Sequence, residues 1–543
     1  MGCIKEIRIK GFKKFKNFTM TFNRTTNILV GDNASGKSTI LEAINIVINQ
    51  WYQYGDRSLI VDLFNREEVL AFKEKPCIDT LPQIAIELDF DCDISLKGME
   101  YSGANHSRPN SKNMALEGIR FVCKINDEYR HQYEAELDKM LHNGDTRDKN
   151  SIEVPYEYYE LSWTRYDGLP YTRRSKPLRI ININTDKSQS KMALYNYNKQ
   201  LFDNVYNEDE KKEIKNAVRV GINKISKNAF KEIDSSNCRR FDIDPKKTIL
   251  ESIINIYDSD VSLDNQGSGV ESKIKIELAL SHKKDFDIIQ IEEPENHLSF
   301  INLRKIIKKI ENDNDGIQLI ISTHSSMISS HLDLNNVIWI NEEQSHSLSN
   351  ISQDTAKFFK KLPNNYFLQI VLSNKVIIVE GATESILMPY FYRFITEKDI
   401  YTDNISIIPC NGVSYERYVE IAKPLKKRVA VITDNDKSER KIEQLKDFNT
   451  KSNNIKYFTE QDINNWTWEV CLLNKNKNTL EGLINPKEGC KYLYKSKDVG
   501  DSILGYMLNN KVETAYKIVE YIEKGGSIDI PNYLKEAIKW LRK

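Results

Sequence analysis

The apolar residues of this chain fall into alternating segments and short unbroken runs, a pattern that predicts strands connected by helices. Ile7 and Ile9 alternate with charged residues, and Met20 and Phe22 do the same, so we expect an antiparallel strand pair with one face in solvent. Four later segments are predicted to be further strands of the same lobe; they read IAIELDFD, IRFVCKI, YEYYELSW and LRIININ.

The spacing changes to a helical period over residues 192–233. Asn207, followed by two acids, has the pattern of a helix cap inside this segment. A stripe of apolar residues at this spacing is usually part of an ordinary core. Its members are Leu194, Leu201, Ile214, Val218, Ile222 and Ile225.

A strand-like run, NILV, leads into GDNASGKST and then into the helix-like TILEAINIVI. This is the spacing of a phosphate-binding loop, GxxxxGK(S/T), between a strand and a helix. Glycine lets backbone N–H groups approach phosphates, Lys37 balances the β/γ charge, and the Ser38 hydroxyl can ligate Mg²⁺. The residues predicted to surround a bound nucleotide are Gly31, Asn33, Gly36, Lys37, Ser38 and Thr39.

Three segments far downstream supply the other parts of an ATPase. FDIIQIEEPENHL predicts a strand ending in Glu292 and Glu293, and IQLIISTHSSMI predicts another ending at His324. Before them, QGSGVESKIKIELAL places Ser268 and Gly269 at the start of a predicted helix. In this order the parts resemble the ABC-type ATPases of the SMC and RecF kind.

That resemblance implies a head that dimerises over ATP, with the Lys37 loop of one subunit facing Ser268 and Gly269 of the other. Glu292 would then bind Mg²⁺ through water, and Glu293 would polarise the attacking water. By the same resemblance, the residue that senses the γ-phosphate would be His324.

Two features depart from the ABC pattern. Glu292 stands where Asp is commoner, and QGSG is degenerate against LSGGQ. Slow ATP turnover, or binding without much turnover, therefore stays open. SMC-type proteins carry coiled-coil arms between the halves of the head, so residues 192–233 are interpreted as a short dimerisation hairpin.

The carboxy-terminal third carries acidic residues directly after predicted buried strands. Two β-branched runs, VIIV and VAVI, are followed by Glu380 in the first case and by Asp434 and Asp436 in the second. Open α/β sheets place their chemistry at the carboxyl ends of such strands. Because Glu384 follows Glu380 by about one helical turn, several carboxylates can converge on a hard cation such as Mg²⁺.

VEGATE followed by ITDNDK resembles the Toprim domain, the metal-dependent module of some nucleases, topoisomerases and primases. An ABC-type ATPase joined directly to a Toprim domain covers nearly the whole chain, and this pairing resembles the OLD (overcoming lysogenisation defect) family. The nuclease subunit of Gabija defence systems and nuclease effectors paired with some retrons belong to that family.

The OLD resemblance implies that the acids hold two divalent metal ions and that a lysine near the carboxy terminus assists at the scissile phosphate. The best match to that lysine is Lys511, although its context NNKVETA departs from the lysine-arginine-phenylalanine motif that is usual in the family. Carried over residue by residue, the metal ligands are Glu380, Glu384, Asp434, Asp436 and Glu469.

The resemblance implies an ATP-regulated, divalent-metal-dependent DNA endonuclease or nickase of bacterial anti-phage defence. Its cofactors would be ATP and Mg²⁺ or Mn²⁺, and its partners DNA and further copies of the chain. The partner protein would be a helicase, a reverse transcriptase with its DNA product, or none. The alternative is a RecF-like, ATP-dependent DNA-binding scaffold that does not cut. A topoisomerase needs a strand-passing partner domain, and no zinc-binding head supports a primase.

The expected fold class is α/β, with an SMC/RecF-like ATPase head, a helical dimerisation insertion and a Rossmann-like Toprim domain. The expected boundaries are 1–190 and 236–355 for the head, 191–235 for the insertion and 373–543 for the Toprim domain. The polar run 341–352 would be the linker.

Composition adds three constraints. The 543 residues exceed one ordinary core, and 78 Lys+Arg balance 78 Asp+Glu, so DNA contacts would need local basic patches. Two such patches border the acidic cluster in sequence, at 423–428 and 491–497. Eight cysteines without CxxC or CxxH spacing argue against a zinc module or a disulfide scaffold. Neither a leader nor a membrane-spanning run is recognisable, so a cytoplasmic location is expected.

Overall fold

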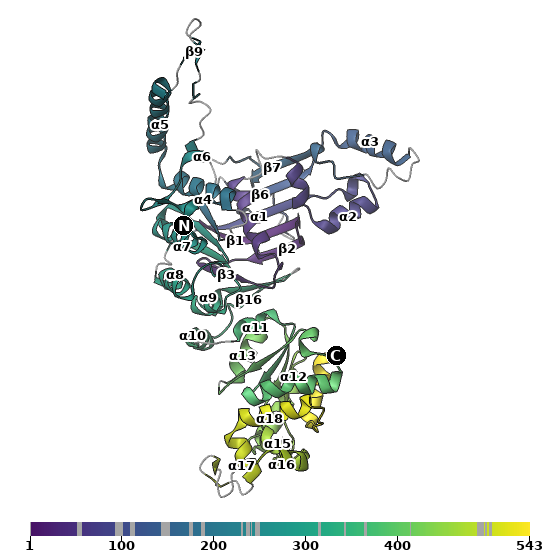
Figure 1. Ribbon diagram of the computed structural model, residues 1–543. Helices are drawn as coiled ribbons and strands as arrows, with labels where there is room; N and C mark the ends of the chain where they lie inside the picture. Colours follow the sequence, from purple (N-terminus) through teal and green to yellow (C-terminus); the bar gives the residue numbers. More distant parts are fainter. Residues whose placement is uncertain are drawn as a thin grey trace. The chain divides into compact units, whose positions relative to one another are not determined.

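Parallel strands lie at the centre of both units into which the chain divides (Figure 1). The first unit comprises Met1–Leu332 and Asn336–Ser345, and the second comprises Asp333–Asn335 and His346–Lys543. The computed structural model describes residues 2–50, 57–92, 101–108, 115–142, 152–172, 177–185, 190–229, 232–234, 239–240, 242–244, 250–312, 316–341, 344–362, 366–412, 414–485, 493–494, 497–498 and 502–543.

The first unit contains a largely parallel sheet of six strands. Five of them, β8, β13, β14, β3 and β15, pair in parallel. Strands β3 and β14 are buried along their whole length, as expected for parallel strands covered on both faces. In spatial order the strands are β16 (Ser345–Ser347), β15 (Val337–Ile340), β3 (Thr26–Val30), β14 (Gln318–Ser322), β13 (Ile288–Glu292) and β8 (Ile180–Asn184).

An antiparallel sheet forms the other layer of the first unit. The predicted pair at its start is confirmed, because Ile7 lies opposite Met20 in an antiparallel register. Three of the four later segments join this sheet, whereas LRIININ contributes β8 to the parallel sheet. The strands are β2 (Phe15–Thr21), β1 (Gly2–Phe12), β4 (Ile84–Cys92), β6 (Leu116–Ile125) and β5 (Ser102–Gly103), with β7 (Tyr159–Arg165) also paired to β6.

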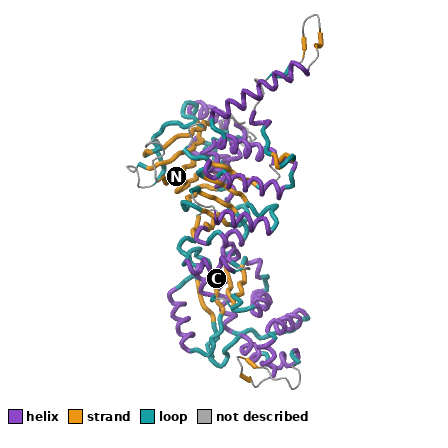
Figure 2. The backbone as a smooth tube through the Cα atoms, turned by 90° about the vertical axis from the view of Figure 1, so that its left-hand side faces the viewer, coloured by secondary structure: helices purple, strands orange, loops and turns teal. Residues whose placement is uncertain are grey.

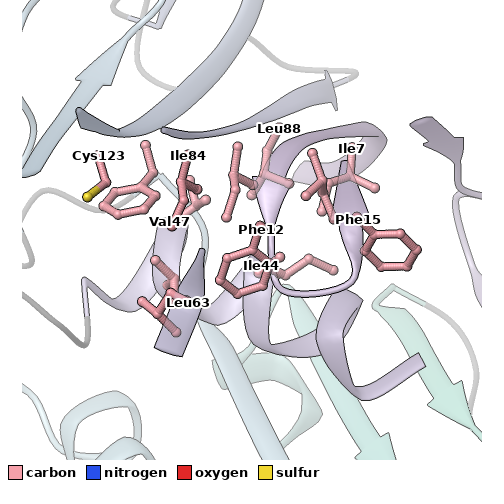
Figure 3. Packing of buried hydrophobic residues seen from close by; sticks show 14 of the residues in the cluster. Ile7, Phe12, Phe15, Ile44, Val47, Leu63, Ile84, Leu88 and Cys123 are labelled. Carbon is pink, nitrogen blue, oxygen red and sulfur yellow. The ribbon is translucent and has the colours of Figure 1, made fainter. Parts of the chain in front are cut away.

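The inner face of the antiparallel sheet packs on helix α1 (Lys37–Asn49), as Figure 3 shows. Ile7 and Leu88 come from the sheet, and Ile44 and Val47 come from the helix; all four side chains are buried. The helix that follows the phosphate loop is therefore fixed by the same core that holds the sheet.

The outer face of this sheet is only partly the solvent-exposed face that the alternation predicted: Lys10 and Thr19 are exposed, whereas an ion cluster covers the part around Arg8. Arg8 lies there within 2.9 Å of Glu87 and 2.7 Å of Asp89, whose side chains are only 2% and 3% exposed. Burial alone raises the pKa of Asp89, but hydrogen bonds from Arg8 and Tyr166 bring it below its usual value. Charged residues can leave solvent here because each finds an opposite charge.

The segment predicted to be helical forms two helices, α4 (Ser190–Val205) and α5 (Glu208–Ala229). Asn207 caps the second, since its side chain accepts hydrogen bonds from the N–H groups of Asp209 and Glu210. The first helix belongs to the core of the unit, because the Tyr197 hydroxyl donates to the carbonyl of Lys275 at 2.7 Å. By contrast, α5 extends away from the sheets, and its Ile225 is 61% exposed (Figure 2).

The remaining elements of the first unit cover or connect the two sheets. Among the residues that the structure describes, no helix is both long and apolar enough to cross a membrane. The helices are α2 (Arg66–Glu74), α3 (Arg130–His142), α6 (Leu250–Ile253), α7 (Ser268–Ser281), α8 (Phe300–Asn312) and α9 (Ser326–His331), and short hairpins pair β9 (Glu232–Asp234) with β10 (Arg239–Arg240) and β11 (Tyr257–Asp258) with β12 (Val261–Ser262).

The second unit is built on four parallel strands in the order β18-β17-β19-β20. They are β18 (Ile405–Pro409), β17 (Lys375–Val379), β19 (Arg428–Ile432) and β20 (Ile455–Phe458). Its helices are α10 (Gln353–Lys361), α11 (Phe367–Leu372), α12 (Ala382–Thr396), α13 (Tyr415–Ala422), α14 (Glu439–Lys451), α15 (Trp468–Lys475), α16 (Lys477–Leu483), α17 (Ser502–Asn509), α18 (Lys511–Glu523) and α19 (Asn532–Arg542), and a hairpin pairs β21 (Leu493–Tyr494) with β22 (Lys497–Asp498).

The buried ion cluster predicts a large loss of stability from Arg8→Met. The substitution removes the cation nearest to Glu87 and Asp89 and leaves Arg120 at 3.3 Å from Glu87 and Arg108 at 3.9 Å from Asp89. It should lower the free energy of unfolding by up to about 3–5 kcal/mol in a urea titration. Arg24→Met is the matched control, because Arg24 contacts Asp91 at 2.8 Å with 53% of its side chain exposed. That change should cost at most about 1 kcal/mol. Equal losses in the two variants would contradict the assignment.

Candidate functional site

The predicted acidic residues of the second unit meet at the carboxyl edge of its sheet. Strands β17 and β19 are parallel neighbours, so the residues that follow them emerge side by side. A carboxylate oxygen of Glu380 accepts a hydrogen bond from the N–H of Asp434 at 3.0 Å and another from the Thr433 hydroxyl. Two segments more than fifty residues apart in sequence are thereby joined at one point.

Two helix starts add further carboxylates to this edge. Glu384 lies in the first turn of α12, and Glu469 lies in the first turn of α15, where the helix dipole favours negative charge. Asp434 also contacts the start of α15, since its Oδ1 accepts a hydrogen bond from the N–H of Trp468 at 2.9 Å.

The carboxylates are close enough to disturb one another's ionisation. Burial raises the pKa of Asp434 to about 8, and the charges of Glu380, Glu469 and Glu384 add to that rise. Burial and the charge of Glu469 likewise raise the pKa of Glu384 to about 7, although its own backbone N–H opposes the shift. Without added positive charge, this edge is costly to ionise fully.

Lys511 supplies one positive charge to the group. Its Nζ lies 2.7 Å from Oε1 of Glu469, a side chain only 3% exposed. Burial pulls the pKa of Lys511 down, but the carboxylates of Glu469, Glu384 and Asp434 raise it above its usual value. The lysine proposed from sequence is therefore placed at the acids.

Asp436 lies to one side of the other acids. Its backbone is left-handed, with φ 52°, and its carboxylate contacts Nζ of Lys441 at 2.8 Å. The same ammonium lies 4.0 Å from Glu380. Lys441, in the first turn of α14, was not singled out from the sequence, because its neighbourhood is rich in lysines.

Asn435, between the two aspartates, is a further residue that the sequence reasoning missed. Its side chain is fully buried, and its amide donates to the carbonyls of Glu460, Asp462 and Asn465. Its Oδ1 accepts the N–H of Lys437 at 3.0 Å. These bonds hold two consecutive left-handed residues after it, a costly conformation that needs such support. The one available signal was an asparagine, which tolerates and braces tight turns.

The donor chemistry of this edge fits a hard divalent cation, because all five acids present oxygen atoms. Oε2 of Glu469 is buried and makes no hydrogen bond, so it has capacity for a cation. Among the described residues, however, no three side chains of His, Cys, Asp or Glu are already spaced as a coordination group.

The first of the two predicted basic patches does not border the acids as expected. Residues 423–428 lead into the amino end of β19, whereas Asp434 follows its carboxyl end, so the two lie at opposite edges of the sheet. Arg428 is engaged there with Trp540, whose ring lies 4.5 Å from the guanidinium. Most of the second patch, 491–497, lies outside the described residues.

The phosphate loop of the first unit connects β3 to α1, as the motif predicted. The ammonium of Lys37 donates to the carbonyls of Gly31 and Asp32 at 3.0 and 3.1 Å. Gly36 needs its missing side chain, because φ is 104° and a Cβ atom would lie 2.3 Å from the ring of Phe15. Ser38 and Asn33 are exposed, and Thr39 is half-buried.

The downstream ATPase residues gather beside this loop. Burial lowers the pKa of Lys37, while the charges of Glu293 and other nearby acids oppose that effect. Nε2 of His324 lies 3.7 Å from Glu293, and burial together with the charge of Lys37 lowers the pKa of His324. Oε2 of Glu292 accepts a hydrogen bond from Asn184 at 3.0 Å.

Glu295 is a second residue that the sequence reasoning missed in this region. Its Oε1 accepts hydrogen bonds from the Thr323 hydroxyl at 2.8 Å and from the N–H of His324 at 2.5 Å. It therefore fixes the loop that carries His324. The predicted signature residues Ser268 and Gly269 begin α7, and Gly269 lies against the carbonyl of His297.

Comparison with known proteins assigns families to both units. Residues 3–328 match the AAA ATPase domain family (AAA_15), and residues 371–436 match the Toprim domain of overcoming lysogenization defect protein-like sequences. The chain is 23% identical over 589 residues to "Endonuclease GajA" of Bacillus cereus (strain HuB5-5), covering 88% of this chain and 82% of that protein.

Two further similarities are to proteins of the SMC type. A stretch of 52 residues is 48% identical to "Structural maintenance of chromosomes protein 3 homolog" of Plasmodium falciparum (isolate 3D7), covering 9% of this chain and 4% of that protein. A solved SMC head bound to the C-winged helix domain of ScpA covers 64% of this chain and 99% of its own, with a TM-score of 0.34 and 14% identity. Because the ATPase match spans more than half of the sequence and an OLD-like Toprim match follows it, the chain belongs to the AAA ATPase domain family and is a nuclease of the OLD family.

Proposed function

We propose that this OLD family nuclease is an ATP-regulated DNA endonuclease that depends on divalent metal ions and acts against phage DNA. One observation carries the proposal: Glu380, Glu384, Asp434, Glu469 and Lys511 gather at one edge of the Toprim sheet. The similarity to a protein named an endonuclease, over most of both chains, supports the same reading.

The metal-binding part rests on the acids and the buried free oxygen of Glu469. Mg²⁺ or Mn²⁺ at this edge, as two ions, would make a water nucleophilic and stabilise the leaving oxygen. Glu380, Asp434 and Asn435 hold the strand ends in register for that purpose. Lys511 brings a positive charge to the edge, where it can neutralise charge that develops on the scissile phosphate.

The ATP-binding part rests on the phosphate loop and its neighbours. Lys37 is held inward by backbone carbonyls, so its ammonium is already positioned for the phosphates of ATP. Ser38 would ligate Mg²⁺ there together with Glu292, Glu293 would orient the attacking water, and His324 would respond to the γ-phosphate. In a dimer, Ser268 and Gly269 of a second copy would face this loop.

Regulation follows from the union of both sites in one chain. ATP binding changes how two heads associate, and the Toprim domains are carried along with them. We propose that nucleotide occupancy thereby controls access of DNA to the acidic edge. The exposed apolar residues of α5 are the proposed contact between copies, since Val220 and Ile225 are 56% and 61% exposed.

Asp434→Asn should reduce cleavage of supercoiled plasmid in Mg²⁺ or Mn²⁺ by more than about a hundredfold. Even the mutation of a residue that only supports a metal ligand lowers metal affinity or activity by about 10–100-fold. ATP binding should be unchanged. Asp447→Asn is the control, since Asp447 pairs with Lys451 on the exposed face of α14. If both variants cut alike, Asp434 is not part of the site; if the wild type never cuts, the DNA-binding scaffold is favoured.

Lys37→Ala should weaken ATP binding by about ten- to a hundredfold, the effect of losing a hydrogen bond from a charged donor. It should also abolish the difference between cleavage rates measured with and without ATP. Both quantities can be followed with a fluorescent ATP analogue and a plasmid assay. A nucleotide response that survives in Lys37→Ala would show that the two sites are not coupled.

Ile225→Asp should weaken self-association by about tenfold or more, because a charge would replace a side chain whose burial stabilises by about 1.5–3 kcal/mol. Analytical ultracentrifugation over a concentration series measures this. Asn223→Asp adds the same charge to an exposed position of α5 and is the control. Point substitutions are preferable to deletion of residues 192–233, because α4 packs in the unit's core. Unchanged association in Ile225→Asp would exclude α5 as the contact.

A further inference from the structure

The acidic edge of the Toprim sheet is served by two lysines that contact different carboxylates. Lys511 pairs with Glu469 at 2.7 Å, and Lys441 pairs with Asp436 at 2.8 Å while lying 4.0 Å from Glu380. Three of the five acids thus lie within 4.0 Å of an ammonium, Glu469 beside Lys511 and Asp436 and Glu380 beside Lys441. Neither the sequence motifs nor the family matches give Lys441 a role.

The position of Lys441 on its helix is fixed, but its charged end can move. The N–H of Lys441 donates to the side chain of Ser438, the residue that caps α14. Its side chain is 21% exposed, so the ammonium already borders solvent. A lysine has four rotatable side-chain bonds, and its head can swing away without any movement of the helix.

A divalent ion and the ammonium compete for the same oxygen atoms. Asp436 and Glu380 are both proposed ligands, and the ammonium of Lys441 occupies the approach to both. An ion with two charges replaces one positive charge with two, so it can displace the ammonium.

The displaced ammonium would remain beside the site, where DNA brings phosphates. Lys437, the residue after Asp436, is engaged differently, because its Nζ lies 4.8 Å from the ring of Trp466. The first patch of basic residues lies at the opposite edge of the sheet. Lys441 is therefore well placed to meet the backbone next to the scissile phosphate.

We propose that Lys441 holds the place of a cation at Asp436 and Glu380 in the metal-free protein, and that a divalent ion releases it to bind a DNA phosphate. Lys441 is then a DNA-binding residue whose carboxylate partners differ from the partner of Lys511. This inference rests on the proposed function of the acidic edge as a metal site that acts on DNA.

Lys441→Met tests the proposal because it should change two affinities in opposite directions. Removing the competing charge should lower the Kd for Mn²⁺, titrated without DNA and followed by electron paramagnetic resonance, by at least about threefold. Duplex DNA should bind more weakly, and the slope of log K against log salt should fall by about 0.9. DNA binding is measured by anisotropy with Ca²⁺ in place of Mn²⁺, an ion that also takes oxygen ligands.

Two control variants separate this role from a structural one. Lys451→Met removes a Lys–Asp pair of 2.6 Å from the exposed face of the same helix, and both affinities should match the wild type. Lys441→Arg keeps the charge and should retain the salt slope. Lys441→Gln serves as a second neutral variant if Lys441→Met lowers the melting temperature.

Each outcome decides the inference. Mn²⁺ binding in the neutral Lys441 variants that is no tighter than in Lys451→Met overturns it, as does an unchanged salt slope. A wild type that never cuts DNA, with Mn²⁺ binding still tighter in Lys441→Met, would overturn the proposed nuclease activity and leave the displacement of Lys441 supported. Weaker Mn²⁺ binding and weaker DNA binding together would indicate a structural role and overturn the inference.

Discussion

Repulsion between buried carboxylates is the constraint on which the second unit depends. Burial and the charges of neighbouring acids raise the pKa of Glu384 and of Asp434, and the protein keeps these acids together with Glu380 and Glu469 through parallel strands and helix starts. The first turns of α12 and α15 offer helix dipoles to Glu384 and Glu469. Lysines then supply the positive charge that the edge lacks. An edge with this charge imbalance is suited to attract divalent cations.

The same electrostatic rule governs the first unit with a different result. Arg8, with Arg108 and Arg120, neutralises Glu87 and Asp89 in a cluster whose carboxylates are buried and satisfied, so the cluster stabilises the sheet. Lys37 is held only by two backbone carbonyls, and burial lowers its pKa. A cation with such weak partners is ready for an anion. Satisfied charges mark structure here, and incompletely satisfied charges mark the sites.

In both sites, oxygen atoms of the protein hold lysine side chains in place. Lys37 donates hydrogen bonds to the carbonyls of its own loop, and Lys441 and Lys511 pair with acids at the edge of the Toprim sheet. In both units a left-handed backbone supports the arrangement: Gly36 before α1, and Asp436 with Lys437 after β19. Strain of this kind persists only where surrounding contacts fix it, and Asn435 provides those contacts in the Toprim domain.

The sequence by itself determined the parts that depend on local spacing. Three features could be predicted from the sequence: the phosphate loop, the paired acids after β13, and the acids after β17 and β19. A motif, or a buried strand followed by acids, is a property of neighbouring residues. The antiparallel start and the cap at Asn207 were predicted for the same reason.

Only the tertiary structure decided which distant residues share a face or an edge. It placed β8 in the parallel sheet, covered part of the outer face of β1 with an ion cluster, and placed residues 423–428 at the edge of the sheet opposite to the acids. It also revealed Asn435, Glu295 and Lys441, whose partners come from other loops or depend on where a side chain points. Such contacts depend on strand order and loop geometry, which periodicity along one chain cannot specify.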